Sequence, residues 1–132
     1  MENELKAHLV YVNELVKRTM QVLKIKNVYW RPMTNRVAPV NTAKDYSLGY
    51  TDLNKRIITI DILTPKKRKP KRANGILRVL AHEIAHLQKP PYRQRHRGRI
   101  ITRMHFPKFY KQVNKNIAKI KKDTLLGQFF HQ

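Results

Sequence analysis

Apolar residues recur every three or four positions in three stretches of the chain, which predicts three amphipathic helices. The first covers residues 4–24, where one stripe is apolar and the lysines lie opposite it. The second covers residues 74–88 and ends before Pro90-Pro91, because proline cannot continue a helix. The third begins near Pro107, a residue well suited to a first helical turn.

Between the first two helices the pattern changes to the alternation that is typical of β-strands. Residues 46–50 and 56–62 are predicted to form a hairpin, joined by the polar residues 51–55. Prolines interrupt residues 32–45, which are predicted to be a loop or a short edge strand. Together the elements predict one α+β domain over residues 1–132, with a short antiparallel or mixed sheet between an N-terminal helix and two later helices.

The charge of the chain adds a candidate partner to this picture. Lys and Arg number 29 against 8 Asp and Glu, a formal net charge of +21, and 19 of the 29 follow Asp61. Such a field attracts polyanions, nucleic acid above all. Two segments, predicted to be basic loops over residues 65–72 and 89–99, concentrate the charge. The candidate nucleic-acid contacts are Lys66, Lys67, Arg68, Lys69, Lys71, Arg72, Arg93, Arg95, Arg97 and Arg99.

Other uses of the basic segments stay open. The whole surface charge is also compatible with binding to anionic lipid or with general solubility. Residues 65–72 fit a nuclear-import signal in a eukaryotic cell, a phosphate-contacting loop or a solvated tether equally well.

Two absences narrow the classes of protein. The chain has no cysteine, which excludes a disulfide scaffold, a thiol nucleophile and a Cys-ligated zinc ribbon or finger. No apolar run approaches the ~20 residues that a membrane span needs, and the N-terminus is acidic and polar. We therefore expect an intracellular location without a membrane partner.

Residues 82–86 read His-Glu-Ile-Ala-His, which places two histidines on one face of the second helix. This face lies opposite the apolar stripe, so His82 and His86 are expected to point into a cleft and to bind one zinc ion per chain. Glu83 lies beside them and is predicted to take a proton from zinc-bound water as the general base. The alternative is that both histidines are purely structural.

Catalytic zinc needs a third protein ligand and one open coordination position. No Glu follows Glu83, and the only later acid, Asp123, lies in a lysine-rich stretch. His96 lies among the arginines of the second basic segment, whereas His105 stands at the start of the third helix, with Phe109 one turn later to anchor it. Because a ligand belongs on a rigid element, His105 is favoured, and His96 and Asp123 are the alternatives.

These motifs resemble the SprT-like (Spartan/Wss-type) zinc metallopeptidase domain. The similarity is carried by the His-Glu-Ile-Ala-His of residues 82–86 and by the His-x-Pro-x-Phe-Tyr of residues 105–110. The predicted hairpin that precedes them is similar to the active-site strands of that family. The resemblance covers residues 28–115.

The resemblance implies a zincin-like α+β fold in which His82, His86 and His105 bind zinc and Glu83 is the general base. It also implies cleavage of proteins that are bound or crosslinked to DNA. Phe106 replaces the glycine that usually follows the third histidine, and no zinc ribbon follows the core. The basic segments of the domain itself would therefore have to hold the DNA.

The sequence thus predicts a zinc-dependent endopeptidase that acts on proteins at DNA. Tyr92 and Tyr110 are candidates for holding the oxyanion. The alternative is a non-enzymatic basic nucleic-acid-binding or packaging protein, of the kind that a virus encodes, in which the zinc motif is incidental. A metal-dependent hydrolase of a non-peptide substrate is a third reading.

Overall fold

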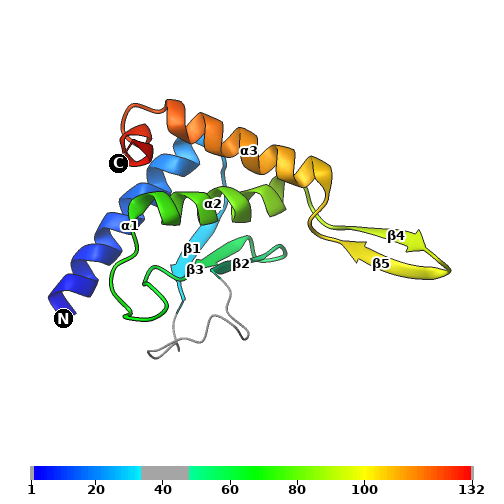
Figure 1. The fold of residues 1–132 in the computed structure, drawn as a ribbon, viewed down its shortest axis with the longest axis horizontal. Coiled ribbons are helices and arrows are strands. Elements are labelled where there is room, and N and C mark those ends of the chain that lie inside the picture. The colour runs from blue at the N-terminus through cyan, green and yellow to red at the C-terminus, as the bar shows by residue number, and fades with distance from the viewer. Residues whose placement is uncertain (1, 34–47, 132) are drawn as a thin grey trace.

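The computed structural model describes residues 2–33 and 48–131 and has the predicted α+β class (Figure 1). The three predicted helices are present; the first two begin and end within two residues of their expected bounds, and the third begins at Pro107 as expected. The elements in chain order are α1 (Glu2–Leu23), β1 (Tyr29–Pro32), β2 (Gly49–Asp52), β3 (Ile57–Ile60), α2 (Ala73–Gln88), β4 (Tyr92–His96), β5 (Arg99–Arg103), α3 (Pro107–Lys122) and the 3-10 helix η1 (Gly127–Phe130).

The first sheet has the strand order β1-β3-β2, with β1 parallel and β2 antiparallel to β3. The predicted hairpin is therefore present, but Thr51 and Asp52, expected in the connection, belong to β2. The Asp52 carboxylate accepts hydrogen bonds from the backbone N–H groups of Asn54 at 3.1 Å and Lys55 at 2.9 Å. This turn chemistry starts the connection after Asp52. The predictions for residues 34–47 lie outside the described residues.

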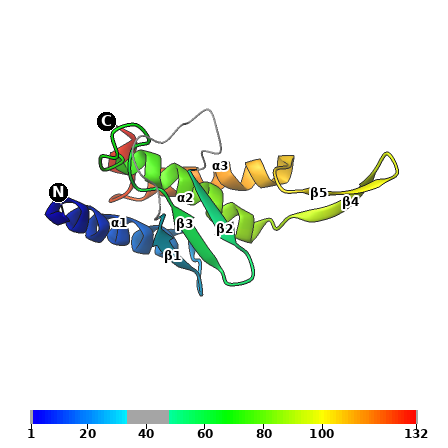
Figure 2. The same ribbon diagram turned by 90° about the horizontal axis from the view of Figure 1, so that it is seen from below.

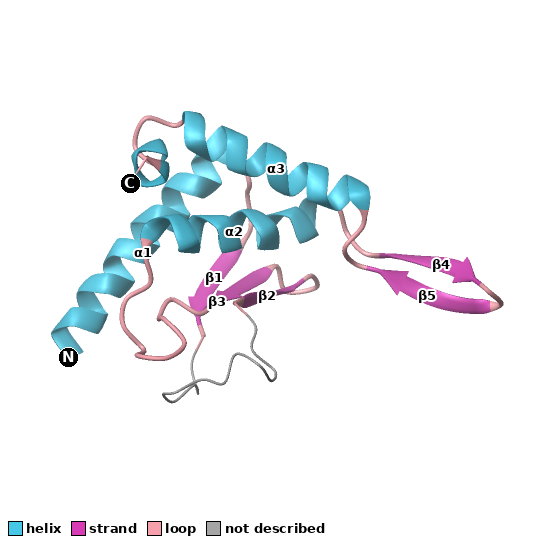
Figure 3. Ribbon diagram, in the orientation of Figure 1, coloured by secondary structure: helices cyan, strands magenta, loops and turns pink. Residues whose placement is uncertain are grey.

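Helix α2 lies at the centre of the molecule, between the sheet and the other two helices (Figures 1 and 3). Its apolar stripe is fully buried from Ile76 to Ile84, as are Ile58 and Ile60 of β3. Leu15 and Val16 of α1 join the same core. Burial of the stripe at about 25 cal/mol per Å² fixes the rotation of α2 and therefore which of its residues face away from the core.

The second basic segment is not a loop. Residues 92–96 and 99–103 form an antiparallel hairpin, β4–β5, which extends away from the helices (Figures 1 and 2). The prediction of a loop over residues 89–99 was wrong because the arginines hid the strand pattern. The turn residues Arg97 and Gly98 both have positive φ, 52° and 78°, as the tight turns of β-hairpins require.

The first basic segment does form irregular turns, as predicted, but it is tied to the core. The backbone N–H of Lys71 donates to the Ile62 carbonyl at 2.9 Å. Arg68, expected at the surface, donates two hydrogen bonds to the buried Asp61 carboxylate, at 2.9 and 3.0 Å. The segment therefore closes one side of the fold.

Over residues 2–33 and 48–131, no helix combines the length and the apolar character that crossing a bilayer requires.

Candidate metal centre

Three histidines from two elements come together in the structure. His82 and His86 lie one turn apart on α2, with ring centroids 5.0 Å apart. His105 lies between β5 and α3, and its ring centroid is 5.3 Å from that of His82 and 4.9 Å from that of His86. One ring nitrogen of each residue lies within 4.8 Å of the others. A single ion can therefore be reached by all three imidazoles.

The buried ring of Phe109 packs against all three histidines of this cluster. Its side chain is fully buried and lies four residues after His105 on α3. The ring stacks on His86 at a centroid distance of 4.4 Å and meets His82 and His105 edge-on at 4.9 and 5.2 Å. The predicted anchor therefore touches all three histidines and restricts their rotation, as a ligand set requires.

The electrostatics of the cluster favour the neutral form of His82 and of His86. Burial lowers the pKa of His82, and the nearby His105 lowers it further. Burial, followed by the charges that His82 and His105 would carry, lowers the pKa of His86 to about 4. Neutral imidazole is the form that binds metal ions. The rings of His82 and His86 are therefore ready to act as ligands at neutral pH.

A buried atom of His86 tests whether a metal fits. Its Nδ1 atom is shielded from solvent and has no hydrogen-bond partner. Buried polar atoms rarely lack a hydrogen-bond partner in a folded protein. Where one does, a bound ion is one of the groups that can fill the place of that partner. Three converging imidazoles beside an open cleft match the ligand set of catalytic zinc. The donor set therefore fits zinc.

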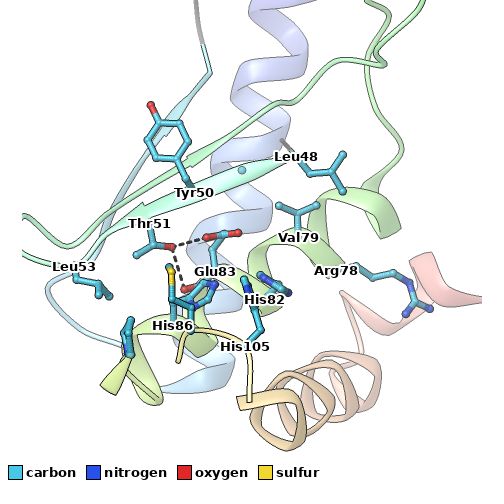
Figure 4. Close-up of a pocket in the computed structure, with 13 residues that line it drawn as sticks. Leu48, Tyr50, Thr51, Leu53, Arg78, Val79, His82, Glu83, His86 and His105 are labelled. Atoms are coloured by element: carbon cyan, nitrogen blue, oxygen red, sulfur yellow. Dashed lines mark hydrogen bonds between the residues drawn. The ribbon is translucent and has the colours of Figure 1, made fainter. Parts of the chain in front are cut away.

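Glu83 lies in the same cleft and is 5% exposed. The Thr51 hydroxyl approaches two oxygens of this residue, at 2.7 Å from the Oε1 atom and 3.2 Å from the backbone carbonyl (Figure 4). Burial raises the pKa of Glu83, and the hydrogen bond from Thr51 opposes that rise. A carboxylate with a raised pKa is suited to taking and returning a proton near neutral pH.

The sequence analysis missed Thr51 as a site residue because it assigned residues 51–55 to a connection. One signal in the sequence could have found it. The threonine follows Gly49-Tyr50, and glycine in a strand often marks a close approach of two backbones. A Cβ atom on Gly49 would lie 2.8 Å from the Thr59 carbonyl oxygen and 3.1 Å from Val79 on α2. The absence of a side chain therefore lets β2 approach α2.

The cleft around these groups has a volume of about 580 Å³. One wall is β2 and the other is α2, with His105 at the end of the cleft where the β4–β5 hairpin begins (Figure 4). Pro91 and Met104, which flank that hairpin, also line the cleft. The cleft combines an apolar surface with a few converging polar groups, which is the usual character of a ligand-binding site.

The other predicted site residues lie elsewhere. His96 stands at the distal end of β4, and Asp123 pairs with Arg18 at 2.6 Å, so neither belongs to the histidine cluster. Tyr110 stacks on His105 at a centroid distance of 6.1 Å, and Tyr92 contacts Phe106 at 5.0 Å. Neither tyrosine lines the cleft.

The ten predicted nucleic-acid contacts divide between the two ends of α2. Those over residues 66–72 precede its first residue, Ala73, and those over residues 93–99 follow its last. Arg68 is engaged by Asp61, whereas Lys66, Lys67 and Lys69 are exposed. The structure therefore separates the two basic segments rather than joining them in one patch.

Comparisons of the chain with protein-family models, with curated proteins and with solved structures return no match. The resemblance to SprT-like peptidases accordingly depends on the quoted motifs. The geometry of the histidines, Glu83 and the cleft is the basis for assigning a function.

Proposed function

We propose that this protein is a zinc-dependent endopeptidase. The observation that carries the proposal is the meeting of His82, His86 and His105 in one cleft with the buried carboxylate of Glu83. One zinc ion per chain, held by three imidazoles, would polarise a scissile carbonyl and make water acidic enough to react at neutral pH.

Glu83 is assigned the proton transfers. Its carboxylate takes a proton from the attacking water, whose hydroxyl oxygen forms a bond to the carbonyl carbon. The same proton then passes to the amide nitrogen as the carbon–nitrogen bond breaks, so that the products are a carboxylic acid and an amine. Thr51 holds the carboxylate at 2.7 Å and is a positioning residue in this scheme.

The shape of the cleft supports a polypeptide substrate. Its walls are a strand and a helix that run beside each other, and its lining is largely apolar. An extended peptide laid along β2 brings its backbone past the histidine cluster, with side chains alternating toward and away from the cleft. A compact small molecule would not use the length of β2.

The charge of the chain supports substrates that are associated with DNA. Formal net charge is +21, and only Glu83 and Asp123 oppose the bases that follow Asp61. We therefore include proteins bound or crosslinked to DNA in the proposed substrate class.

Metal analysis and proteolysis of one preparation test the proposal. The purified protein is loaded with zinc, dialysed and assayed on an unfolded protein such as reduced casein. We expect about one zinc per chain, cleavage that a chelator stops and added zinc restores, and loss of about 10²–10⁴ in rate for Glu83→Gln with zinc content unchanged. Glu4→Gln, an exposed change on α1, is the matched control. Cleavage by Glu83→Gln at the wild-type rate would refute the assigned role.

A second candidate is a non-enzymatic nucleic-acid-binding protein, which the exposed, arginine-rich β4–β5 hairpin favours. It predicts DNA binding with neither stoichiometric zinc nor proteolysis. The same preparation therefore separates the two functions.

A further inference from the structure

We propose that the β4–β5 hairpin, residues 92–103, is an arm that enters the major groove of duplex DNA beside the candidate metal centre. The hairpin is called the arm below. The proposal rests on the isolation, the charge, the shape and the place of this element.

The arm has no part in the core. Every residue of β4 is exposed, and β5 alternates between exposed and half-buried residues. Across the described part of the chain, the two strands pack against each other rather than against another element, and both views show the arm standing clear of the helices (Figures 1 and 2). A two-stranded hairpin in water gains little stability of its own. The arm is therefore better explained as an element that binds a partner than as one that stabilises the fold.

The charge of the arm is uniform and is not neutralised within the protein. Residues 92–103 include five arginines and no acid. The ion pairs found among the described residues join Arg18 to Asp123 and Arg68 to Asp61, and none of them involves the arm. Arg103 donates to the Gln94 side chain at 2.9 Å, a bond that leaves its charge uncompensated. The missing counter-charge is what a polyanion supplies.

The shape of the arm selects the kind of nucleic acid. The major groove of B-DNA is ~12 Å wide and admits a two-stranded β-ribbon, whereas the major groove of A-form RNA is too narrow for side chains to read. The residues of one face, Arg93, Arg95, Ile100 and Thr102, include two arginines for phosphates or guanine edges. Ile100 on that face is 68% exposed, as a side chain that meets thymine methyl groups must be.

The place of the arm links it to the cleft. Pro91 comes directly before β4 and Met104 directly after β5, and both line the cleft. Tyr92 contacts Phe106 at 5.0 Å, which fixes the base of the arm against the start of α3 beside His105. DNA held by the arm therefore lies next to the cleft, and a protein attached to that DNA lies within reach of it. This last consequence rests on the proposed peptidase function.

Fluorescence anisotropy of a labelled DNA duplex tests the arm in the full chain. The arm variant changes Arg93, Arg95, Arg97 and Arg99 to Gln. The matched control removes the same charge from the exposed face of α3 by changing Lys111, Lys115, Lys119 and Lys122 to Gln. We expect the arm variant to lose about 100-fold or more in affinity, and the slope of log affinity against log salt to fall in magnitude by about 3–4. The α3 variant is expected to lose less than about 5-fold, since its lysines would act only at a distance.

Four further measurements keep the result specific. Circular dichroism of the arm variant must match the wild type, and a variant with Lys at the same four positions is expected to keep the salt slope. Duplex RNA of equal length is expected to bind at least 10-fold more weakly. Equal losses in the arm and α3 variants, or equal affinity for duplex RNA, would overturn the proposal, as would an arm variant that loses binding to phosphatidylserine vesicles but not to DNA. No cleavage is measured here, so failure of this test leaves the metal-centre proposal standing, and the reverse also holds.

Discussion

Two polar clusters of this small fold are built on opposite plans, one of opposite charges and one of like groups. Asp61 and Arg68 carry opposite charges and are joined by a pair of hydrogen bonds at 2.9 and 3.0 Å. His82, His86 and His105 are three groups of the same kind, and protonation of one opposes protonation of the next. The charges of the first cluster compensate each other within the protein. A buried nitrogen lacks a hydrogen-bond partner in each cluster, Nε of Arg68 and Nδ1 of His86, so what marks the second cluster as the functional one is the convergence of three potential metal ligands beside an open cleft.

The two basic segments differ in the same way. The segment before α2 gives Arg68 to the core and folds back on itself, with the Thr64 N–H donating to the Lys69 carbonyl at 2.7 Å. The arm after α2 gives none of its arginines to the protein's own acids across the described residues. Arg68 therefore serves the structure at one end of α2, whereas the arginines of the arm at the other end, which look the same in the sequence, are available to a partner.

The largest expected effect is on the metal. His105→Ala removes one of three proposed ligands, so zinc affinity should fall by more than the roughly 10–100-fold that loss of an outer-shell partner costs. Competition with a chelating dye measures this affinity. His96→Ala is the control and should leave it unchanged, because His96 lies at the far end of β4. If instead the His96 variant lost zinc and the His105 variant kept it, the assignment of the third ligand would be wrong.

Breaking the other cluster should affect stability instead. Asp61→Ala leaves the Arg68 guanidinium buried without its carboxylate, so the free energy of unfolding should fall by about 3–5 kcal/mol. Urea denaturation measures the loss, and zinc affinity of the folded protein should stay near that of the wild type. Arg95→Ala on the arm should change stability by less than about 0.5 kcal/mol. A loss of similar size in both variants would erase the contrast between the two basic segments.

The pH dependence of the zinc-free protein should expose the histidine cluster. The pKa of His86 is lowered to about 4, so between about 6.5 and about 4 the unfolded chain binds more protons than the folded one. Stability is therefore lost as the pH falls through this range. Burial raises the pKa of Glu83, which acts with the opposite sign. The difference between thermal unfolding curves of the wild type and a His82→Asn/His86→Asn variant isolates the histidines, and parallel curves would contradict the prediction.

The smallest effect is expected from Thr51→Val, which removes the hydroxyl but keeps the shape. The rate of cleavage should fall by about 10-fold, the equivalent of one hydrogen bond to a charged group. Without this donor the pKa of Glu83 rises, so the acidic limb of the pH–rate profile should move to higher pH. Thr51→Ser should restore both properties. A lower rate with an unmoved profile would assign Thr51 to packing alone.

Those parts of the site that depend on local geometry could be predicted from the sequence. Four positions along a helix bring His82 and His86 to one face, and the buried stripe of α2 decides where that face points. Pro107 starts α3, so His105 is expected just before the first turn of this helix and Phe109 within that turn. These features follow from periodicity and backbone chemistry within a few residues.

The tertiary structure decided what depends on residues far apart. It placed Thr51 beside Glu83, 32 positions later, and paired Arg68 with Asp61 rather than leaving it in solvent. It also turned an arginine-rich stretch into the β4–β5 hairpin, because cross-strand hydrogen bonds and a turn with positive φ outweigh the repulsion that suggested a loop. A hydrogen bond between distant segments leaves no period in the sequence, and only the packed chain shows which polar groups are satisfied from within.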